Sequence, residues 1–253
     1  MRDDLYKINF GGCVLHYKGT VLPMNPVPDS SPYNCVGFCC ECERRGLSKQ
    51  TGGKEILMSH GCDGEDIARA IGEGLPRGMT DKRVMFLFEN PGGDYGLGIP
   101  QTIQHADIGI VTKTPPVKHY YWTTNAKRWP QNISEVYNPY GDFLAYLIYM
   151  FGLVNVYVTN CIKCKYTGAE YGKTAANCMN FILKSEIDAF KPEVIFCFGR
   201  RAYNLLTSQS FVDVSGVLCK RLLHPAQRRY KRCRYYEMNK SLIEECGFVA
   251  RAS

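Results

Sequence analysis

Polar side chains that could do chemistry follow successive apolar runs of this 253-residue chain. Glu89 and Asn90 come directly after the run Val84 to Phe88. Asn160 follows a second run, and His224 follows the last. A carboxylate can hold or deprotonate a water, an amide can donate and accept at once, and an imidazole can donate to a developing anion. Each signal is weak alone, since a lone Asn usually caps a turn and a lone His is usually structural.

Thirteen cysteines are a second chemical signal. Their number is odd, the chain is long and its first residues show no export signal, so we do not expect a disulfide framework. Thiolates bound to a metal in a reducing compartment fit better, and we expect a cytoplasmic protein. Residues 1–60 contain four prolines and the cysteine cluster Cys35 to Cys42. This segment has little apolar surface to pack against the rest of the protein, so a bound metal would fix it in place.

The charge is modestly basic, at +7. Seven basic residues gather near the C-terminus with no acid among them: Lys220, Arg221, Arg228, Arg229, Lys231, Arg232 and Arg234. Such a run fits a polyanionic partner such as nucleic acid, or simply a solvated surface face. No apolar run approaches the roughly 18 residues that a membrane span needs.

Strands alternate with helices along the chain. Val84 to Phe88 reads as a strand buried on both faces, and Pro91, Gly92 and Gly93 end it. Further strands are predicted at Val154 to Thr159, Val194 to Phe198 and Val217 to Leu223. Helices are predicted at Asp63 to Leu75, Phe143 to Phe151, Thr174 to Phe190, Arg200 to Leu206 and Met238 to Glu245.

This alternation predicts a three-layer α/β/α fold around a central, mostly parallel four-stranded sheet. The carboxyl ends of parallel strands meet at one edge, where open α/β sheets keep their ligand crevices, so the polar groups should meet there. We expect one domain over residues 1–253, with an N-terminal excursion over 1–60 and a long aromatic insertion over 93–138.

Taken in order, the motifs resemble the uracil-DNA glycosylase superfamily, and most nearly its iron-sulfur branch, often called family 4. Val84 to Gly92 is similar to that branch's strand and Gly-Glu-Ala-Pro-Gly turn, and Thr159 to Cys164 to its Thr-Asn-x-x-Lys-Cys. Phe198 to Ala202 is similar to its Leu-Gly-x-x-Ala, and Leu223 to Ala226 to its His-Pro motif. The resemblance covers about Phe38 to Arg229.

Two departures from that branch lie in the turn. Phe88 replaces its first glycine and Asn90 its alanine. The resulting Asn-Pro-Gly is closer to the mismatch-specific and single-strand-selective branches, in which this asparagine positions the attacking water.

The resemblance implies a DNA glycosylase that flips a nucleotide into a pocket and excises its base. His224 would donate to the O2 atom of the departing pyrimidine, and Asn90 or Glu89 would hold the attacking water. Asn160 would pair with the base edge. Tyr140, aligned with the family's Pro-Phe, would stack on the base. The enzyme should be monofunctional, because no lysine lies at the catalytic turn to form a Schiff base.

The predicted base pocket also includes Phe88 and Gly92. Gly92 stands where the uracil-restricted branch has a tyrosine that blocks substituents at C5, so the pocket can admit a C5-modified pyrimidine such as phage DNA carries. The insertion over 93–138 would enlarge the pocket or grip DNA. Uracil and a modified base both remain open as substrates, as do repair and defence against foreign DNA.

Four cysteines match the family's cluster: Cys39, Cys42, Cys164 and Cys178. The resemblance implies a structural [4Fe-4S] cluster on these thiolates. A zinc ion on the same ligands is the alternative. Cys35, Cys40 and Cys161 are close enough in sequence to substitute as ligands.

The basic run directly after His224 now gains a role. Gln227 to Arg232 would form the loop that enters the DNA groove, and Arg228, Arg229, Lys231 and Arg232 would hold phosphates. We therefore expect DNA as the partner of a monomeric protein that does not bind membranes.

Two other functions compete with a glycosylase. Cys35, Cys39 and Cys42 have the spacing of radical S-adenosylmethionine enzymes, although the repeated strand-helix units of their barrel are missing. The second competing function is a non-catalytic DNA-binding module on the same fold. The presence of Asn160 and His224 argues against it.

Overall fold

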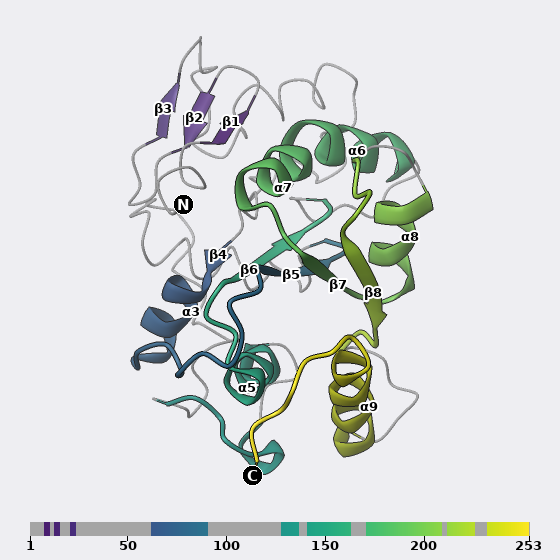
Figure 1. Cartoon of the computed structure of the whole chain (residues 1–253). Helices are drawn as coiled ribbons and strands as arrows, with labels where there is room; N and C mark the ends of the chain where they lie inside the picture. Colours follow the sequence, from purple (N-terminus) through teal and green to yellow (C-terminus); the bar gives the residue numbers. More distant parts are fainter. Residues whose placement is uncertain are drawn as a thin grey trace, which may run out of the picture.

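A computed structural model of the chain describes residues 8–10, 13–15, 21–23, 62–90, 128–136, 141–162, 171–208, 212–225 and 232–252. Its central sheet has the strand order β4-β6-β5-β7-β8 (Figure 1). β5 (Val84–Phe88), β6 (Val156–Asn160), β7 (Val194–Phe198) and β8 (Leu218–Leu222) are parallel. β4 (Cys62–Asp63) pairs antiparallel with β6 at one edge. The predicted α/β fold with four parallel strands is confirmed. The two-residue β4 was not predicted, because it is too short to show a pattern.

Burial explains which strands are central. Every residue of β5, β6 and β7 is buried, as expected for parallel strands covered on both faces. β8 lies at the other edge and carries Lys220 and Arg221, which are partly or fully exposed. Charged side chains on an edge strand oppose the pairing of a further strand. The sheet is open, so the described residues give no support to a barrel.

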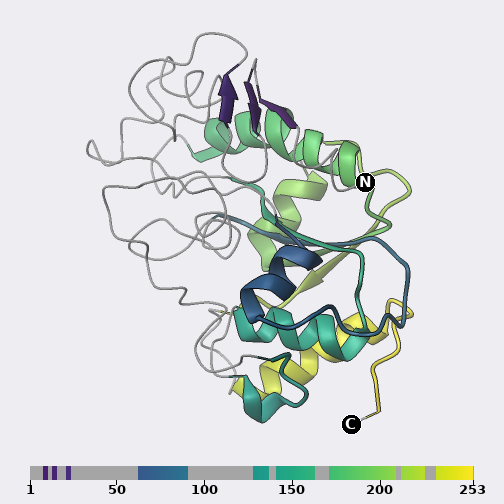
Figure 2. The ribbon, with the colours of Figure 1, turned by 90° about the vertical axis from the view of Figure 1, so that its left-hand side faces the viewer.

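Helices cover both faces of the sheet. α5 (Gly141–Phe151) and α9 (Arg232–Glu244) pack on one face together with α3 (Gly64–Ile71). α6 (Tyr171–Cys178), a π-helical segment (Met179–Leu183), α7 (Lys184–Phe190) and α8 (Arg200–Ser208) pack on the other. Figures 1 and 2 show these two layers with the sheet between them. In the described ranges, no helix is both long and apolar enough to cross a membrane.

Two helices differ in length from the prediction. α3 ends at Ile71 rather than Leu75, because Gly72 turns the chain with a φ of 88°. α9 begins at Arg232 rather than Met238, because its first turns carry arginines and tyrosines instead of a simple apolar stripe. The other predicted helices and strands agree with the structure to within about three residues at each end.

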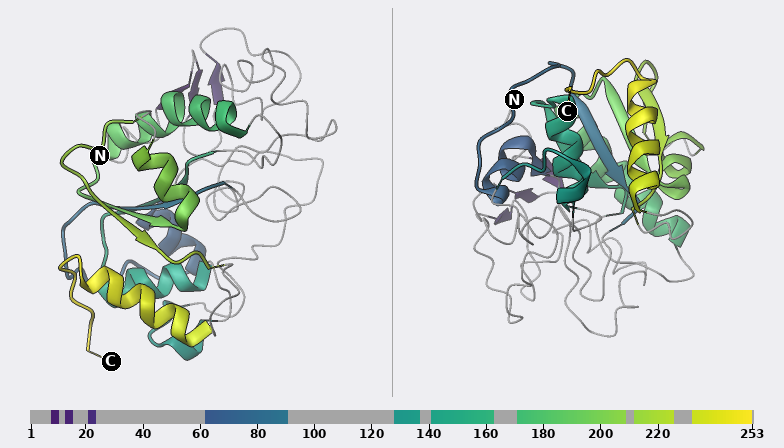
Figure 3. Two further views of the ribbon diagram at one scale, coloured as in Figure 1. Left: turned by 90° about the vertical axis from the view of Figure 1, so that its right-hand side faces the viewer. Right: turned by 90° about the horizontal axis from the view of Figure 1, so that it is seen from below.

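The N-terminal excursion contains three short strands that its sequence did not predict. β1 (Ile8–Phe10), β2 (Cys13–Leu15) and β3 (Val21–Pro23) form an antiparallel sheet. β1 contacts α7 and the π-helical segment, so this small sheet lies on the side of the molecule that α6 and α7 cover (Figures 1 and 3).

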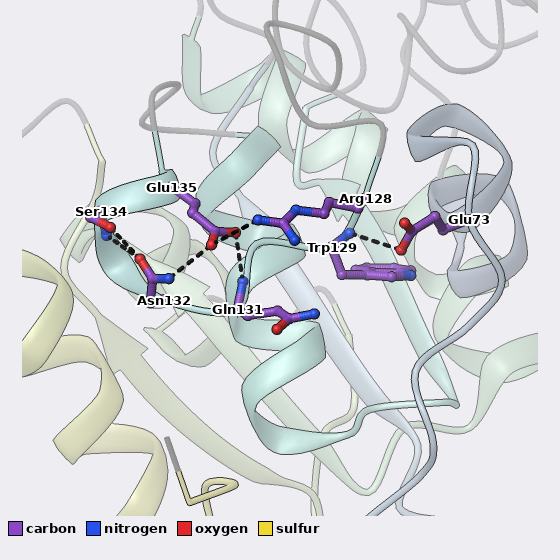
Figure 4. A network of polar contacts seen from close by, with 7 residues as sticks. All are labelled: Glu73, Arg128, Trp129, Gln131, Asn132, Ser134 and Glu135. Atoms are coloured by element: carbon purple, nitrogen blue, oxygen red, sulfur yellow. Dashed lines mark hydrogen bonds and ion pairs between the residues drawn. The ribbon is translucent and has the colours of Figure 1, made fainter.

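Residues 128–136, the described part of the long insertion, are anchored beside the end of α3. The Trp129 side chain is buried, its indole N–H donates to the Gly74 carbonyl, and its backbone N–H donates to Glu73 Oε2 at 3.3 Å (Figure 4). Glu135 closes the segment by accepting from Arg128 Nη2, the Gln131 backbone N–H and Asn132 Nδ2. The insertion is therefore fixed to the core near its C-terminal end. The rest of the predicted insertion, residues 93–127 and 137–138, lies outside the described residues.

Candidate functional site

Two of the predicted polar positions lie side by side where β5 and β6 end. Parallel pairing aligns Phe88 with Asn160. The pairing continues past the strands, because the Cys161 N–H donates to the Phe88 carbonyl at 2.8 Å and the Ile162 N–H to the Glu89 carbonyl at 2.9 Å. These bonds fix the backbone that carries Glu89 beside the end of the strand that carries the buried Asn160 side chain.

His224 reaches the same edge from the other side. It lies two residues beyond the end of β8, and its ring packs edge-on against Phe88, with centroids 6.0 Å apart and planes at 83°. Gly199, directly after β7, has a φ of 95°. A Cβ atom there would lie 3.2 Å from the His224 Cβ, tighter than nine in ten real Cβ contacts. The absence of a side chain at Gly199 lets the imidazole pack down toward the end of β5.

Electrostatics connects His224 with Glu89. Burial lowers the pKa of His224 below its ordinary value of 6.5, and the Glu89 carboxylate opposes this shift by favouring the imidazolium. The lowered pKa makes the imidazole neutral at neutral pH, and a neutral ring can donate one hydrogen bond and accept another.

Arg201 is a member of this site that the sequence analysis did not assign. Its Nη1 lies 3.3 Å from Glu89 Oε1, and it extends from the first turn of α8. The Arg201 side chain is 76% exposed and that of Glu89 21%, so the pair adds little stability and serves to orient the carboxylate. The motif Phe198 to Ala202 contained this arginine, but a strand-to-helix turn alone gives no signal for a partner on another strand.

Behind Asn160, a buried carboxylate holds β6. Glu186 of α7 accepts from Thr159 Oγ1 at 2.9 Å and from the Tyr157 hydroxyl at 3.2 Å. Both donors and the carboxylate are buried. Glu186 was not predicted as part of the site, because the sequence alone does not distinguish a buried glutamate in a helix from a solvent-exposed one.

Phe88, predicted to line the base pocket, is also part of the core. Its ring is 5% exposed and stacks on Phe198, with centroids 4.5 Å apart and planes 6° from parallel. Phe88 therefore links the core to the His224 ring, which packs against it. Contact between Phe88 and a base stays a prediction.

Several predicted residues lie outside the described part of the chain: Gly92, Tyr140, Gln227, Arg228, Arg229, Lys231, Cys39, Cys42 and Cys164. The same holds for the side chain of Arg232, whose backbone begins α9. Asn90 is described and half-buried next to Glu89. Cys178, the last residue of α6, is fully buried. Within the described ranges, no three or more His, Cys, Asp or Glu side chains gather as a metal site.

A protein-family model matches this chain. The model described as the uracil DNA glycosylase superfamily matches residues 75–245, which is more than half of the chain and includes β5 to β8 with the residues that follow them. Comparison with the curated proteins gives no match.

Gly199→Ala should displace the His224 ring. The methyl group meets the His224 Cβ at 3.2 Å, and the φ of 95° also disfavours alanine, so we expect a loss of about 1–2 kcal/mol in unfolding free energy together with changed imidazole signals in NMR spectra. The control is Gly216→Ala, whose φ is 79° but whose added Cβ meets nothing within 4 Å. Unchanged His224 signals in Gly199→Ala, or equal changes in both variants, would contradict the packing described.

Proposed function

The chain belongs to the uracil DNA glycosylase superfamily, and on that basis we propose that it is a monofunctional DNA glycosylase that flips a pyrimidine nucleotide out of DNA and hydrolyses its N-glycosyl bond. The proposal depends most on one observation. Although β7 separates β5 from β8, the His224 ring beyond β8 packs against Phe88, the residue directly before Glu89. An acid or water-holding group and a hydrogen-bond donor thus share one sheet edge.

The charges that develop during the reaction match these two groups. Breaking the bond between sugar and base builds positive charge on the sugar and negative charge on the departing pyrimidine. The neutral His224 imidazole donates to O2 of the base and stabilises the anion, which for a single donor is worth about 3–4 kcal/mol. The Glu89 carboxylate, paired with Arg201 at 3.3 Å, favours the positive charge on the sugar.

The remaining polar groups hold the attacking water and recognise the base. Asn90, with Glu89 beside it, holds the water that attacks the sugar. The Asn160 amide, which can donate and accept at once, pairs with the edge of the flipped base, and Tyr140 stacks on it. The reaction leaves an abasic site without a covalent enzyme intermediate, since no lysine lies in the turn at residues 89–93.

For the substrate, we propose uracil or a pyrimidine enlarged at C5. The support is Gly92, which offers no side chain against the C5 position. The Asn-Pro-Gly turn resembles the mismatch-specific branch and the cysteines the iron-sulfur branch, so the chain combines features of both. The basic residues from Arg228 to Arg232 hold DNA phosphates on either side of the flipped nucleotide.

A panel of DNAs, each with one candidate base, tests the activity. We expect alkali-labile sites at uracil or at a C5-modified pyrimidine, and His224→Ala should lower the excision rate about 100- to 1000-fold through loss of one donor to the anion. DNA affinity and melting temperature should stay close to wild type. Binding without strand breakage for every base would identify a non-catalytic DNA-binding module instead.

The lowered pKa of His224 sets a pH dependence. Protonation of the buried imidazole is resisted in the folded state, so the unfolded state binds the proton more readily, and stability falls as the pH drops below about 6.5. Excision should keep its rate down to the lowered pKa of His224, because the folded protein keeps the ring neutral until that pH is reached. NMR titration should give a pKa below 6.5, and Glu89→Gln should lower it further by removing the carboxylate that favours the cation. Titration at or above 6.5 would refute this account.

We further propose that Cys39, Cys42, Cys164 and Cys178 hold a structural [4Fe-4S] cluster that takes no part in the reaction. Two observations support it. Cys178 is fully buried, and β1 of the N-terminal excursion contacts the π-helical segment that directly follows it. The cluster would tie residues 1–60 to the sheet, as four thiolates from distant segments can.

Anaerobically purified protein should absorb at roughly 400 nm if the cluster is iron-sulfur. Cys178→Ser should remove the absorbance, whereas Cys197→Ser, a change at another fully buried thiol, should retain it. Cys35→Ala should retain it too, in contrast to the radical S-adenosylmethionine alternative. A colourless protein with stoichiometric zinc would decide for zinc.

A further inference from the structure

The backbone of Leu223, the residue before His224, is held by two side chains of α9. Asn239 Oδ1 accepts from the Leu223 N–H at 2.7 Å, and Asn239 Nδ2 donates to the Leu223 carbonyl at 3.0 Å. The Tyr235 hydroxyl donates to the same carbonyl. One amide side chain thus binds both polar groups of a single residue, much as a neighbouring strand would.

We call the hydrogen bonds of Asn239 and Tyr235 to the Leu223 backbone the clamp. The clamp begins where the pairing of β8 with β7 ends. Leu222 is the last residue of β8 in register with β7, opposite Phe198, and its carbonyl accepts from the Gly199 N–H at 2.9 Å. At Leu223, the hydrogen bonds to the backbone come from α9. The Leu223 carbonyl belongs to the peptide unit that joins Leu223 to His224, so bonds to that oxygen fix the plane from which the His224 Cα projects.

The clamp is rigid because both of its side chains are buried and lie next to each other on one side of α9. Tyr235 and Asn239 are four residues apart in α9 and therefore lie on the same side of the helix. Asn239 is 0% exposed and Tyr235 3%. Tyr235 and its neighbour Tyr236 pack on Phe143 of α5, which joins α9 to the helix beside it (Figure 1).

We propose that Asn239 is a positioning residue for His224, which sets the direction in which the imidazole projects at the sheet edge. The inference extends the proposed function, since it assigns to α9 the placement of the donor that stabilises the departing base. Gly199 and Phe88 bound the ring itself, and Asn239 fixes the backbone on which it stands. The simpler alternative is that the same bonds only hold α9 to the sheet.

NMR contacts test the placement without requiring activity. The His224 signals are identified among those of five histidines by their loss in His224→Ala. In Asn239→Ala, the contact between the His224 and Phe88 rings should be lost or shifted, whereas Asn155→Ala should leave it intact. Asn155 is a matched control, because its amide donates to the Asp81 carbonyl at the opposite end of the sheet, at 2.9 Å. Tyr235→Phe removes only one donor and serves if Asn239→Ala does not fold.

Kinetics separates positioning from mere stability. Asn239→Ala should lower kcat about 10- to 100-fold, as expected when a donor is misplaced by about 1 Å, and leave KM nearly unchanged. In the His224→Ala background, the same change should alter kcat less than about twofold, because no imidazole remains to be positioned. An equal loss in both backgrounds, or unchanged ring contacts in Asn239→Ala and Tyr235→Phe, would overturn the proposal. If the wild type excises no base, the proposed function fails, and the ring contacts still decide the role of Asn239.

Discussion

Backbone hydrogen bonds in the central sheet hold Phe88 of β5 level with Asn160 of β6, and Phe198 of β7 level with Leu222 of β8. Every other feature of the site depends on this parallel register. A shift of one residue in any strand would turn each of its side chains to the opposite face and separate the amide from the imidazole. β5, β6 and β7 are buried on both faces, and a slip of β6 would break the hydrogen bonds from Tyr157 and Thr159 to Glu186.

Near the ends of β6 and β8, polar side chains of the helices add further hydrogen bonds. Glu186 binds Thr159 from one side of the sheet, and Asn239 binds Leu223 from the other. In both cases, the residue held directly precedes a residue with a proposed role, Asn160 or His224. A strand end would otherwise lose its partners at the point where precise placement matters most. Buried polar side chains on rigid helices supply that placement at the cost of desolvation, which their hydrogen bonds offset.

Sequence reasoning located the strands of the sheet far better than the residues that support the site. β5 and β7 were predicted to the residue, because five consecutive apolar side chains are typical of a strand covered on both faces. The superfamily also agrees with the sequence reading. Arg201, Glu186 and Asn239 were missed, because an arginine, a glutamate and an asparagine in helices resemble ordinary exposed residues until the fold shows what they face. The prediction also left out the first six residues of α9, because its first turns carry basic and aromatic side chains instead of an apolar stripe.

The central claim is that Glu89, Asn90, Asn160 and His224 meet around one extruded nucleobase. The most direct measurement is a crystal structure of the protein bound to DNA with a pyrimidine nucleotide whose 2′-fluorine slows cleavage of the N-glycosyl bond. The account predicts the base outside the duplex, with the His224 imidazole in hydrogen-bond contact with O2, the Asn160 amide on the base edge, and a water between Asn90 or Glu89 and the sugar. A base that stays stacked in the helix, or one that binds away from His224 and Asn160, would contradict it.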